Sequence, residues 1–388
     1  MSQNKFLKGA AILGIAGIIV KIMGVFFRIP LTNWVGAEGI SYYSSVYPIY
    51  TFFLILSTAG IPVAVSRMVS ERIAVSNYGG AHKVFHTALW FLSLMGFATF
   101  AIVYFGAGFI ESQVLKNEGT MMALQAIAPA LFIVPVMSAY RGYFQGRQNM
   151  NPTAISEITE QLIRVIAGLF LAYKLLDTGL KEAAAGASFG ASAGSIAGLG
   201  IIVIIYMLNR RTIHRKIDLN NKNVEDTAVI LRKIVAIAIP IIIGSEIMPI
   251  MTLIDTGIIM TRLQATGWTY DEAKVLYGLL SGFCNSLIAF PQVFTQAVAV
   301  SLVPAVAAAF KIHDRSGVQS NIQLGYRMTM IMAFPCAFGI FALAEPIMLL
   351  LYSDQKASAV AAVPTLMIMS ISVIFLAITQ TSVGVLQS

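Results

Sequence analysis

Charge and cysteine are both scarce in this sequence. Of its 388 residues only 11% are charged, 57% are hydrophobic, and the chain holds two cysteines and four histidines. Soluble domains carry about 25% charged residues, so a water-soluble enzyme of this size is disfavoured for lack of polar surface. Cys284 and Cys336 both lie inside apolar runs, which argues against a disulfide framework. The composition is typical of a polytopic membrane protein.

Motifs of catalysis, metal binding and nucleic-acid binding are also missing. The sequence has no P-loop, no G-x-S-x-G and no D-x-D pair for sugar-nucleotide chemistry, so no enzymatic activity is expected. His82 and His86 have a metal-ligand spacing but no evident third ligand, and no metal is predicted. The net charge of +8 comes from residues scattered between apolar runs rather than from one basic patch. The expected partners are therefore membrane lipids and not nucleic acid.

Long apolar runs are what the sequence does have. A helix needs about 20 apolar residues to cross the hydrocarbon core, because lipid cannot satisfy free backbone groups. This rule predicts an all-α protein with ten spans, at residues 9–30, 41–66, 84–110, 121–140, 155–176, 184–208, 234–260, 276–309, 328–352 and 359–384. The eighth is long enough to need a tilt or a kink, for which Pro291 and Pro304 are candidates.

Lysine and arginine in the short loops predict the orientation. If the N-terminus is cytoplasmic, the inner loops hold seventeen of these residues and the outer loops hold five. A multi-pass membrane protein with a cytoplasmic N-terminus is expected.

The longest polar stretch divides the chain into two predicted lobes. Residues 1–208 would form an N-terminal lobe of six helices, 209–233 a cytoplasmic linker, and 234–388 a C-terminal lobe with four. The tetrapeptide V-A-V-S occurs at 63–66 and again at 298–301, late in the second span of each lobe, which is typical of a transporter built from two related bundles. If the lobes are related, the second lacks two helices, and a C-terminally truncated sequence is expected.

Two cations lie in the first span, where lipid disfavours charge. Lys21 and Arg28 are seven residues apart, two helical turns, and therefore share a face with Gly14, Gly17 and Gly24. Small residues and cations on one stripe are typical of a surface that faces a cavity. The alternative is that the glycines permit close helix packing and that the cations snorkel to the two interfaces.

The fifth and seventh spans carry acidic residues. Glu157 and Glu160 lie on one stripe with Arg164, and the i,i+4 spacing lets Glu160 form an ion pair with Arg164. This pair could belong to a gate, contact the substrate or be purely structural, and the sequence leaves these roles open. Glu246 and Asp255 flank Pro249 and lie on opposite faces of a straight helix. A carboxylate beside a weakened helix can bind a coupling Na⁺ or H⁺. Asp255 is the preferred ion site and Glu246 the second.

The eighth span carries a neutral polar stripe. Its members are Asn285, Gln292 and Gln296, at i, i+7 and i+11. They line the same cavity or hold helices together, and the sequence leaves both readings open.

Three motifs resemble one family. They are R-I-P-L-T-N-W-V-G-A-E-G-I at 28–40, S-T-A-G-I-P-V-A-V-S-R-M-V-S-E at 57–71 and Y-R-G-Y-F-Q-G-R-Q-N-M-N-P-T-A-I-S-E-I-T-E-Q at 140–161. The chain resembles, over essentially its whole length, the polysaccharide-biosynthesis and stage V sporulation protein B-like branch of the MOP flippase superfamily. The resemblance implies a MOP/MATE-like fold of two six-helix lobes around a central cavity, working by alternating access. The implied cargo is an undecaprenyl-diphosphate-linked sugar, lipid II or a polysaccharide precursor, moved to the outer leaflet for cell-wall or spore-wall synthesis.

The resemblance also assigns roles to residues. Arg28 matches, to within one residue, a first-helix cation of lipid II flippases that meets the diphosphate. Their eighth-helix arginine falls near Asn285, where this chain has none, which weakens the case for lipid II itself. Asp255 matches the seventh-helix acidic residue of Na⁺-coupled members. In this interpretation Lys21 and Arg28 hold the diphosphate, and the saccharide meets the side chains of Tyr47, Asn285 and Gln292.

Two alternatives remain open. A cation-coupled exporter of small cationic drugs belongs to the same superfamily, but Lys21 and Arg28 would repel such cargo. A membrane-embedded glycosyl polymerase or ligase would need a large outer loop with acid and base carboxylates, and the predicted outer loops are short.

Overall fold

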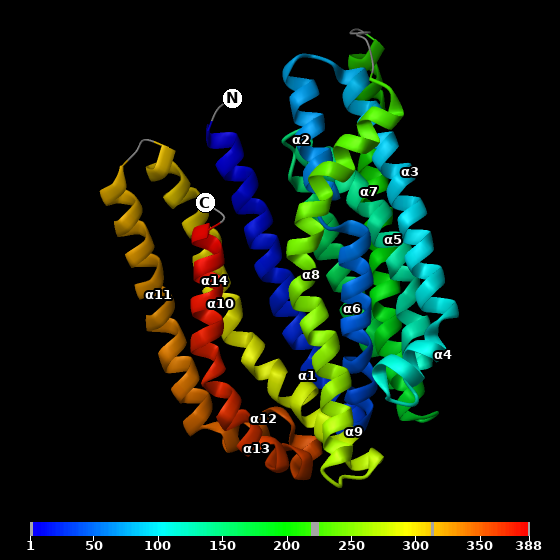
Figure 1. Ribbon diagram of the computed structural model, residues 1–388, viewed down its shortest axis with the longest axis vertical. Coiled ribbons are helices and arrows are strands. Elements are labelled where there is room, and N and C mark those ends of the chain that lie inside the picture. The colour runs from blue at the N-terminus through cyan, green and yellow to red at the C-terminus, as the bar shows by residue number, and fades with distance from the viewer. Residues whose placement is uncertain (1–2, 219–224, 312–313, 387–388) are drawn as a thin grey trace. The chain divides into compact units, whose positions relative to one another are not determined.

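The protein is built from helices. The computed structural model describes residues 3–218, 225–311 and 314–386, and none of these residues lies in a strand (Figure 1). The first elements are α1 (Gln3–Thr58), α2 (Ile61–Ala74), α3 (Tyr78–Phe105), α4 (Ala107–Phe109), the π-helix η1 (Ile110–Leu115), α5 (Met121–Gly146), α6 (Asn151–Leu175) and α7 (Leu180–Asp218). They are followed by α8 (Thr227–Ala265), α9 (Tyr270–Gly278), the π-helix η2 (Leu279–Cys284), α10 (Asn285–Lys311), α11 (Arg315–Ala342), α12 (Ala344–Leu351), the 3₁₀-helix η3 (Ser353–Gln355), α13 (Lys356–Ser370) and α14 (Ser372–Leu386). The predicted all-α class is confirmed.

A glycine divides α1 into two helices. Gly36 has φ 66° and ψ −171°, outside the helical region, and this backbone conformation is open to glycine far more readily than to other residues. A Cβ at this position would also lie 3.2 Å from the Gln355 side chain. The break separates the predicted first span from the second, and the second continues through Gly60 into α2.

Among the described residues, seven helices are long and apolar enough to cross a membrane, or eight if the bent pair Ser353–Ser370 and Ser372–Leu386 is one span. One of these, Ile12–Ala74, has 63 residues and contains the break at Gly36, so it accommodates the first two predicted spans. The predicted fifth span corresponds to α6, which is missing from the seven because Glu157, Glu160, Arg164 and Lys174 make it too charged.

Two of the predicted ranges, the ninth and the tenth, need correction. The ninth predicted span, 328–352, is wrong in its bounds, because α11 begins at Arg315 and ends at Ala342 and α12 is a separate short helix. The tenth is divided into α13 and α14, which meet at a bend of 44°. The eighth contains the π-helix η2, and Pro291 and Pro304 lie inside α10, so the predicted kink at a proline stays a prediction. Apolar runs locate helices but carry little information about where one helix ends and the next begins.

The described chain forms two compact units. Unit 1 contains Met1–Val20 and Tyr42–Tyr270, and unit 2 contains Lys21–Ser41 and Asp271–Ser388. These units group helices by contact in one conformation, whereas the lobes 1–208 and 234–388 are predicted from the longest polar stretch, with support from a short repeat. The division into lobes stays a prediction.

Glycines on one face of α7 bring it close to α6 in unit 1. Gly186, Gly190, Gly194 and Gly198 are spaced four residues apart, and a Cβ at Gly194 would collide with the Glu160 carbonyl oxygen. Small residues at this spacing let two membrane helices approach closely without a hydrophobic driving force. The α6–α7 contact places the polar stripe of α6 inside the bundle, against α7.

In unit 2, α10 packs against α11 and α14, and hydroxyl and amide groups join these helices. Thr329 and Thr381 share a hydrogen bond of 2.8 Å between α11 and α14, and Tyr326 and Ser382 share one of 2.7 Å. Such bonds join apolar helices where a partner-free hydroxyl would be costly.

The start of α8 is tied to α2 by an ion cluster in unit 1. The Glu225 carboxylate lies 2.8 Å from Arg72 Nη2 and 3.0 Å from Lys233 Nζ. The hydrogen bond from Lys233 and the charge of Arg72 hold the pKa of Glu225 below its usual value. The predicted linker 209–233 thus ends in an anchored segment, while its residues 219–224 lie outside the described part of the chain.

Candidate functional site

A buried carboxylate between two arginines is the most concentrated charge inside unit 1. Glu160 Oε2 lies 2.9 Å from Arg141 Nη2, and Glu160 Oε1 lies 3.5 Å from Arg164 Nη2. Only 13–15% of each of the three side chains is exposed. The i,i+4 pair between Glu160 and Arg164 is therefore formed as its spacing predicts, and Arg141 from α5 makes it a three-residue network.

Ser156 and Glu157 complete this network on α6. Arg141 Nη2 donates to Ser156 Oγ at 2.9 Å, and Ser156 Oγ in turn donates to the Gly198 carbonyl of α7 at 3.1 Å. Glu157 is half-buried and lies within electrostatic reach of both Arg141 and Glu160. Two cations and two carboxylates thus occupy one region, which favours a self-neutralised network over an open anion site.

Tyrosines of α1 cover the network. Arg164 Nη1 donates to Tyr47 Oη at 3.5 Å, and the ring of Tyr47 lies 5.7 Å from that of Tyr50. Tyr50 is fully buried, whereas Tyr47 is half-buried. Tyr47, a predicted saccharide contact, is therefore already held by a cation.

Sequence reasoning missed Arg141 as a member of this site. The fourth predicted span ends at residue 140, which leaves Arg141 in a predicted cytoplasmic loop, whereas α5 continues to Gly146. The motif Y-R-G-Y-F-Q-G-R contained the signal for this contact. If the helix is extended by one more turn into the motif, Arg141 becomes part of the helix and can contact its neighbours in the bundle.

In unit 2, Arg28 is bound to a π-helical segment. Its Nη1 donates to the Ser281 carbonyl oxygen at 3.1 Å, and Ser281 lies in η2. A guanidinium has five N–H donors, so this one bond leaves most of its donors for a ligand. The Tyr352 hydroxyl, which donates to the Phe283 carbonyl at 3.3 Å, lies within electrostatic reach of Arg28.

Lys21 has no such anchor. Its side chain is exposed, and across the described residues no hydrogen bond or ion pair of its ammonium group is found. A Cβ at Gly17, one turn earlier on the same stripe, would have no atom within 4 Å. That the whole stripe of glycines and cations lines a cavity stays a prediction.

The two acidic residues of α8 have different surroundings. α8 is helical through both Pro240 and Pro249. Glu246 is only 6% exposed, and neither of its carboxylate oxygens has a hydrogen-bond partner within the described chain. Asp255, on the opposite face, is exposed. The neighbouring Thr252 hydroxyl donates to the Met248 carbonyl of its own helix at 2.9 Å.

The polar stripe of α10 is divided between exposure and packing. Asn285 is exposed at the junction with η2. Gln292 Oε1 accepts a hydrogen bond of 3.3 Å from Gln380 Nε2 of α14, and Gln380 Oε1 accepts one of 2.5 Å from Thr295. Gln292 thus contributes to holding α10 against α14. Asn285 is exposed, and the side-chain oxygen of the half-buried Gln296 has no hydrogen-bond partner within the described chain.

Comparisons with known proteins agree with this architecture. A family model described as polysaccharide biosynthesis protein matches residues 6–310. Stage V sporulation protein B of Bacillus subtilis (strain 168) is 26% identical over 359 residues, which are 92% of this chain and 69% of that protein. Lipid II flippase MurJ of the same organism is 26% identical over 370 residues, 91% of this chain and 67% of that protein.

Among solved structures, the chain is similar to a multidrug resistance MATE family transporter of the MOP superfamily in its inward-facing conformation. The TM-score is 0.75 at 14% identity, over 95% of this chain and 84% of the other. Similarity at this identity concerns the fold alone, and it confirms the predicted MOP/MATE-like fold.

Proposed function

The chain belongs to the polysaccharide biosynthesis protein family, and from this premise we propose that it is a flippase for an undecaprenyl-diphosphate-linked saccharide. The cargo would move from the inner to the outer leaflet of a bacterial plasma membrane, in a protein whose N-terminus is cytoplasmic. Two relatives support this proposal by their names, a lipid II flippase and a stage V sporulation protein. The observation that carries it is Arg28, a membrane-embedded guanidinium with most of its donors unused.

The diphosphate of such a cargo needs a cationic binding site inside the membrane. We propose that Arg28 and Lys21 provide it, since charge-assisted hydrogen bonds to phosphate are strong where water is excluded. Tyr47 and Asn285 stay predicted saccharide contacts. Gln292 is a weaker candidate, because its amide is already engaged by Gln380. The drug-exporter alternative ranks lower, because the two cations would repel a cationic drug.

The expected result of a complementation experiment tests the cargo. When a bacterium is depleted of its own lipid II flippase, the full chain should restore growth, because relatives of this family include such a flippase. The measurement is colony formation under depletion, with immunodetection of the chain in the membrane fraction. Membrane-inserted protein without any rescue would exclude lipid II and favour another polyprenyl-linked saccharide.

A coupling cation is proposed for α8. A buried carboxylate without a hydrogen-bond partner is costly to keep charged, and a bound H⁺ or Na⁺ would neutralise it. Glu246 meets this condition better than Asp255, although the sequence favoured Asp255.

The Glu246→Gln substitution should therefore remove the dependence of transport on an imposed pH or Na⁺ gradient in proteoliposomes. Glutamine keeps the size of the side chain but cannot bind either cation as a carboxylate does. Asp255→Asn is the matched control and should keep the dependence. The reverse pattern, with coupling lost only in Asp255→Asn, would return the ion site to Asp255.

A further inference from the structure

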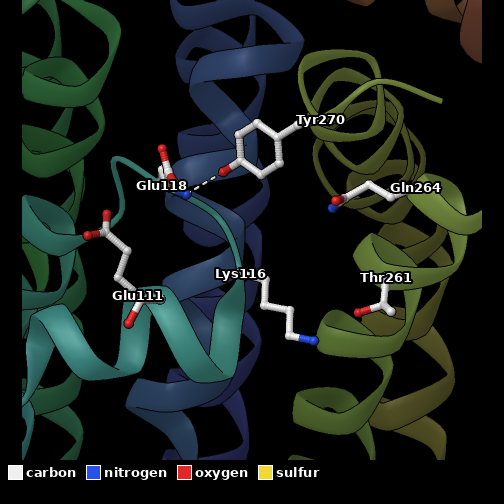
Figure 2. A pocket seen from close by; sticks show the side chains of 7 residues that line it. Glu111, Lys116, Glu118, Thr261, Gln264 and Tyr270 are labelled. Carbon is white, nitrogen blue, oxygen red and sulfur yellow. Dashed lines mark hydrogen bonds between the residues drawn. The ribbon is translucent and has the colours of Figure 1, made fainter.

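A pocket of about 370 Å³, lined by residues with polar side chains, lies in unit 1. It is formed where η1 and the loop before α5 face the last turns of α8, and its lining includes Glu111, Lys116, Glu118, Thr261, Gln264 and Tyr270 (Figure 2). The predicted topology places both the α3–α5 connection and the end of α8 on the outer side of the membrane. Small-molecule sites have about 300–1,000 Å³, so this pocket has room for a small ligand.

One wall of the pocket is fixed by hydrogen bonds. Glu111 Oε1 accepts from the backbone N–H of Gly119 at 2.5 Å and of Met121 at 3.1 Å. Asn117 is fully buried, and its Nδ2 donates to Ser45 Oγ at 2.9 Å. The loop that carries the pocket's lysine is therefore held in one conformation before any ligand arrives.

Tyr270 joins this wall to the chain that follows α8. Its hydroxyl accepts from the Glu118 backbone N–H and donates to Asn117 Oδ1 at 3.4 Å. Figure 2 shows the Tyr270 ring above the pocket, with the Glu118 backbone at its hydroxyl. A flat ring beside polar groups is a surface on which the apolar face of a sugar can lie.

Lys116 holds an unusual backbone conformation. Its φ is 49°, in the left-handed region, which is sterically disfavoured for a residue with a Cβ. Its side chain extends from the loop toward Thr261 (Figure 2), and no ion pair or hydrogen bond of its ammonium group is found in the described chain. Strain of this kind persists where the surrounding structure enforces it, and it accumulates at ligand sites.

The groups that line the pocket select a neutral ligand with many hydroxyls. Lys116 offers donors, and the exposed Glu118 carboxylate offers acceptors. The amide nitrogen of Gln264 is used by the Met260 carbonyl at 3.2 Å, which leaves its oxygen as an acceptor. An ammonium in the middle disfavours a metal cation, and two nearby carboxylates disfavour a strongly anionic ligand.

We propose that this pocket binds the saccharide portion of the cargo on the outer side of the membrane, through Lys116, Gln264 and the Tyr270 ring. The inference rests on the proposed flippase function for the identity of the sugar. Sugar hydroxyls donate and accept at once, so they fit a site where an ammonium and carboxylate or amide oxygens lie close together.

Saccharide binding can be measured without transport. The neutral disaccharide N,N′-diacetylchitobiose is titrated into the full chain in detergent, and saturation-transfer NMR of the sugar is recorded together with tryptophan fluorescence. Trp268 is 47% exposed and lies two residues before Tyr270, so it should report occupancy. We expect saturable binding by the parent chain.

Lys116→Gly is the decisive variant. Glycine adopts a positive φ without strain, so the loop should fold as before while the ammonium donor is lost. Affinity for the disaccharide should fall about tenfold or more, as expected for the loss of a charge-assisted hydrogen bond. Lys356→Ala, which removes an exposed lysine of unit 2 on the predicted outer side, is the matched control and should leave the affinity unchanged.

Two results would overturn the proposal. One is unsaturable or absent binding by the parent chain, or equal affinity in Lys116→Gly. The other is a response to calcium chloride in place of the disaccharide, which would make the pocket a cation site. If the chain rescues a flippase-depleted host but does not bind the saccharide, the proposed role of the pocket is refuted and the proposed flippase function is not. Saccharide binding without rescue would instead count against lipid II as the cargo.

Discussion

Arg28→Glu is expected to reduce transport to below about 1% of the parent chain. The substitution removes charge-assisted hydrogen bonds worth about 1.5–3 kcal/mol and sets a carboxylate against the diphosphate. A loss of about 3 kcal/mol already corresponds to roughly a hundredfold. The measurement is transport of a polyprenyl-diphosphate-linked saccharide in proteoliposomes, together with rescue of a flippase-depleted host.

Arg28→Gln separates the charge from the structural bond. A glutamine amide can still donate to the Ser281 carbonyl, which Arg28 contacts at 3.1 Å, but it carries no charge. If Arg28 serves the diphosphate, this variant should also lose most transport while keeping the thermal stability of the parent. Arg67→Glu, at an arginine whose side chain is 67% exposed, is the control and should remain active. Full activity of Arg28→Glu would remove Arg28 from the proposed site.

Glu160→Ala should lower the free energy of unfolding by about 3–5 kcal/mol, the range for removing one partner of a buried ion pair. The substitution leaves Arg141 and Arg164 without their shared carboxylate, at positions where only 13–15% of each side chain is exposed. The measurement is the unfolding midpoint of the purified chain in mixed micelles, followed by circular dichroism.

A second Arg–Glu pair provides the matched control for this experiment. Arg67 and Glu71 also lie at i,i+4, at 2.9 Å, but their side chains are 67% and 57% exposed. Glu71→Ala should therefore change stability by less than about 1 kcal/mol, because solvent screens exposed pairs. Equal effects of Glu160→Ala and Glu71→Ala would show that burial adds nothing at Glu160 and that the network is not structural.

Periodicity predicted which polar residues of α6 share a face, and spacing predicted the Glu160–Arg164 pair. It could not predict that Arg141 would join them, since that contact depends on where α5 ends and on how α6 approaches α5 and α7. For α8, spacing placed Glu246 and Asp255 on opposite faces. Which face is buried depends on neighbouring helices, and the structure buries Glu246 and leaves Asp255 exposed.

The sequence by itself determined that this is a helical membrane protein, where most of its helices lie, and which family it belongs to. Those properties follow from apolar length and local motifs, because lipid forces each span to satisfy its backbone within itself. Only the tertiary structure decided the bounds of the ninth and tenth ranges, the Arg28 contact with η2 and the pocket around Lys116. The Arg28 contact and the pocket join segments far apart in the chain, and no local pattern specifies which distant carbonyl or side chain a helix will meet. The helix bounds are decided by breaks inside apolar runs that hydropathy does not mark.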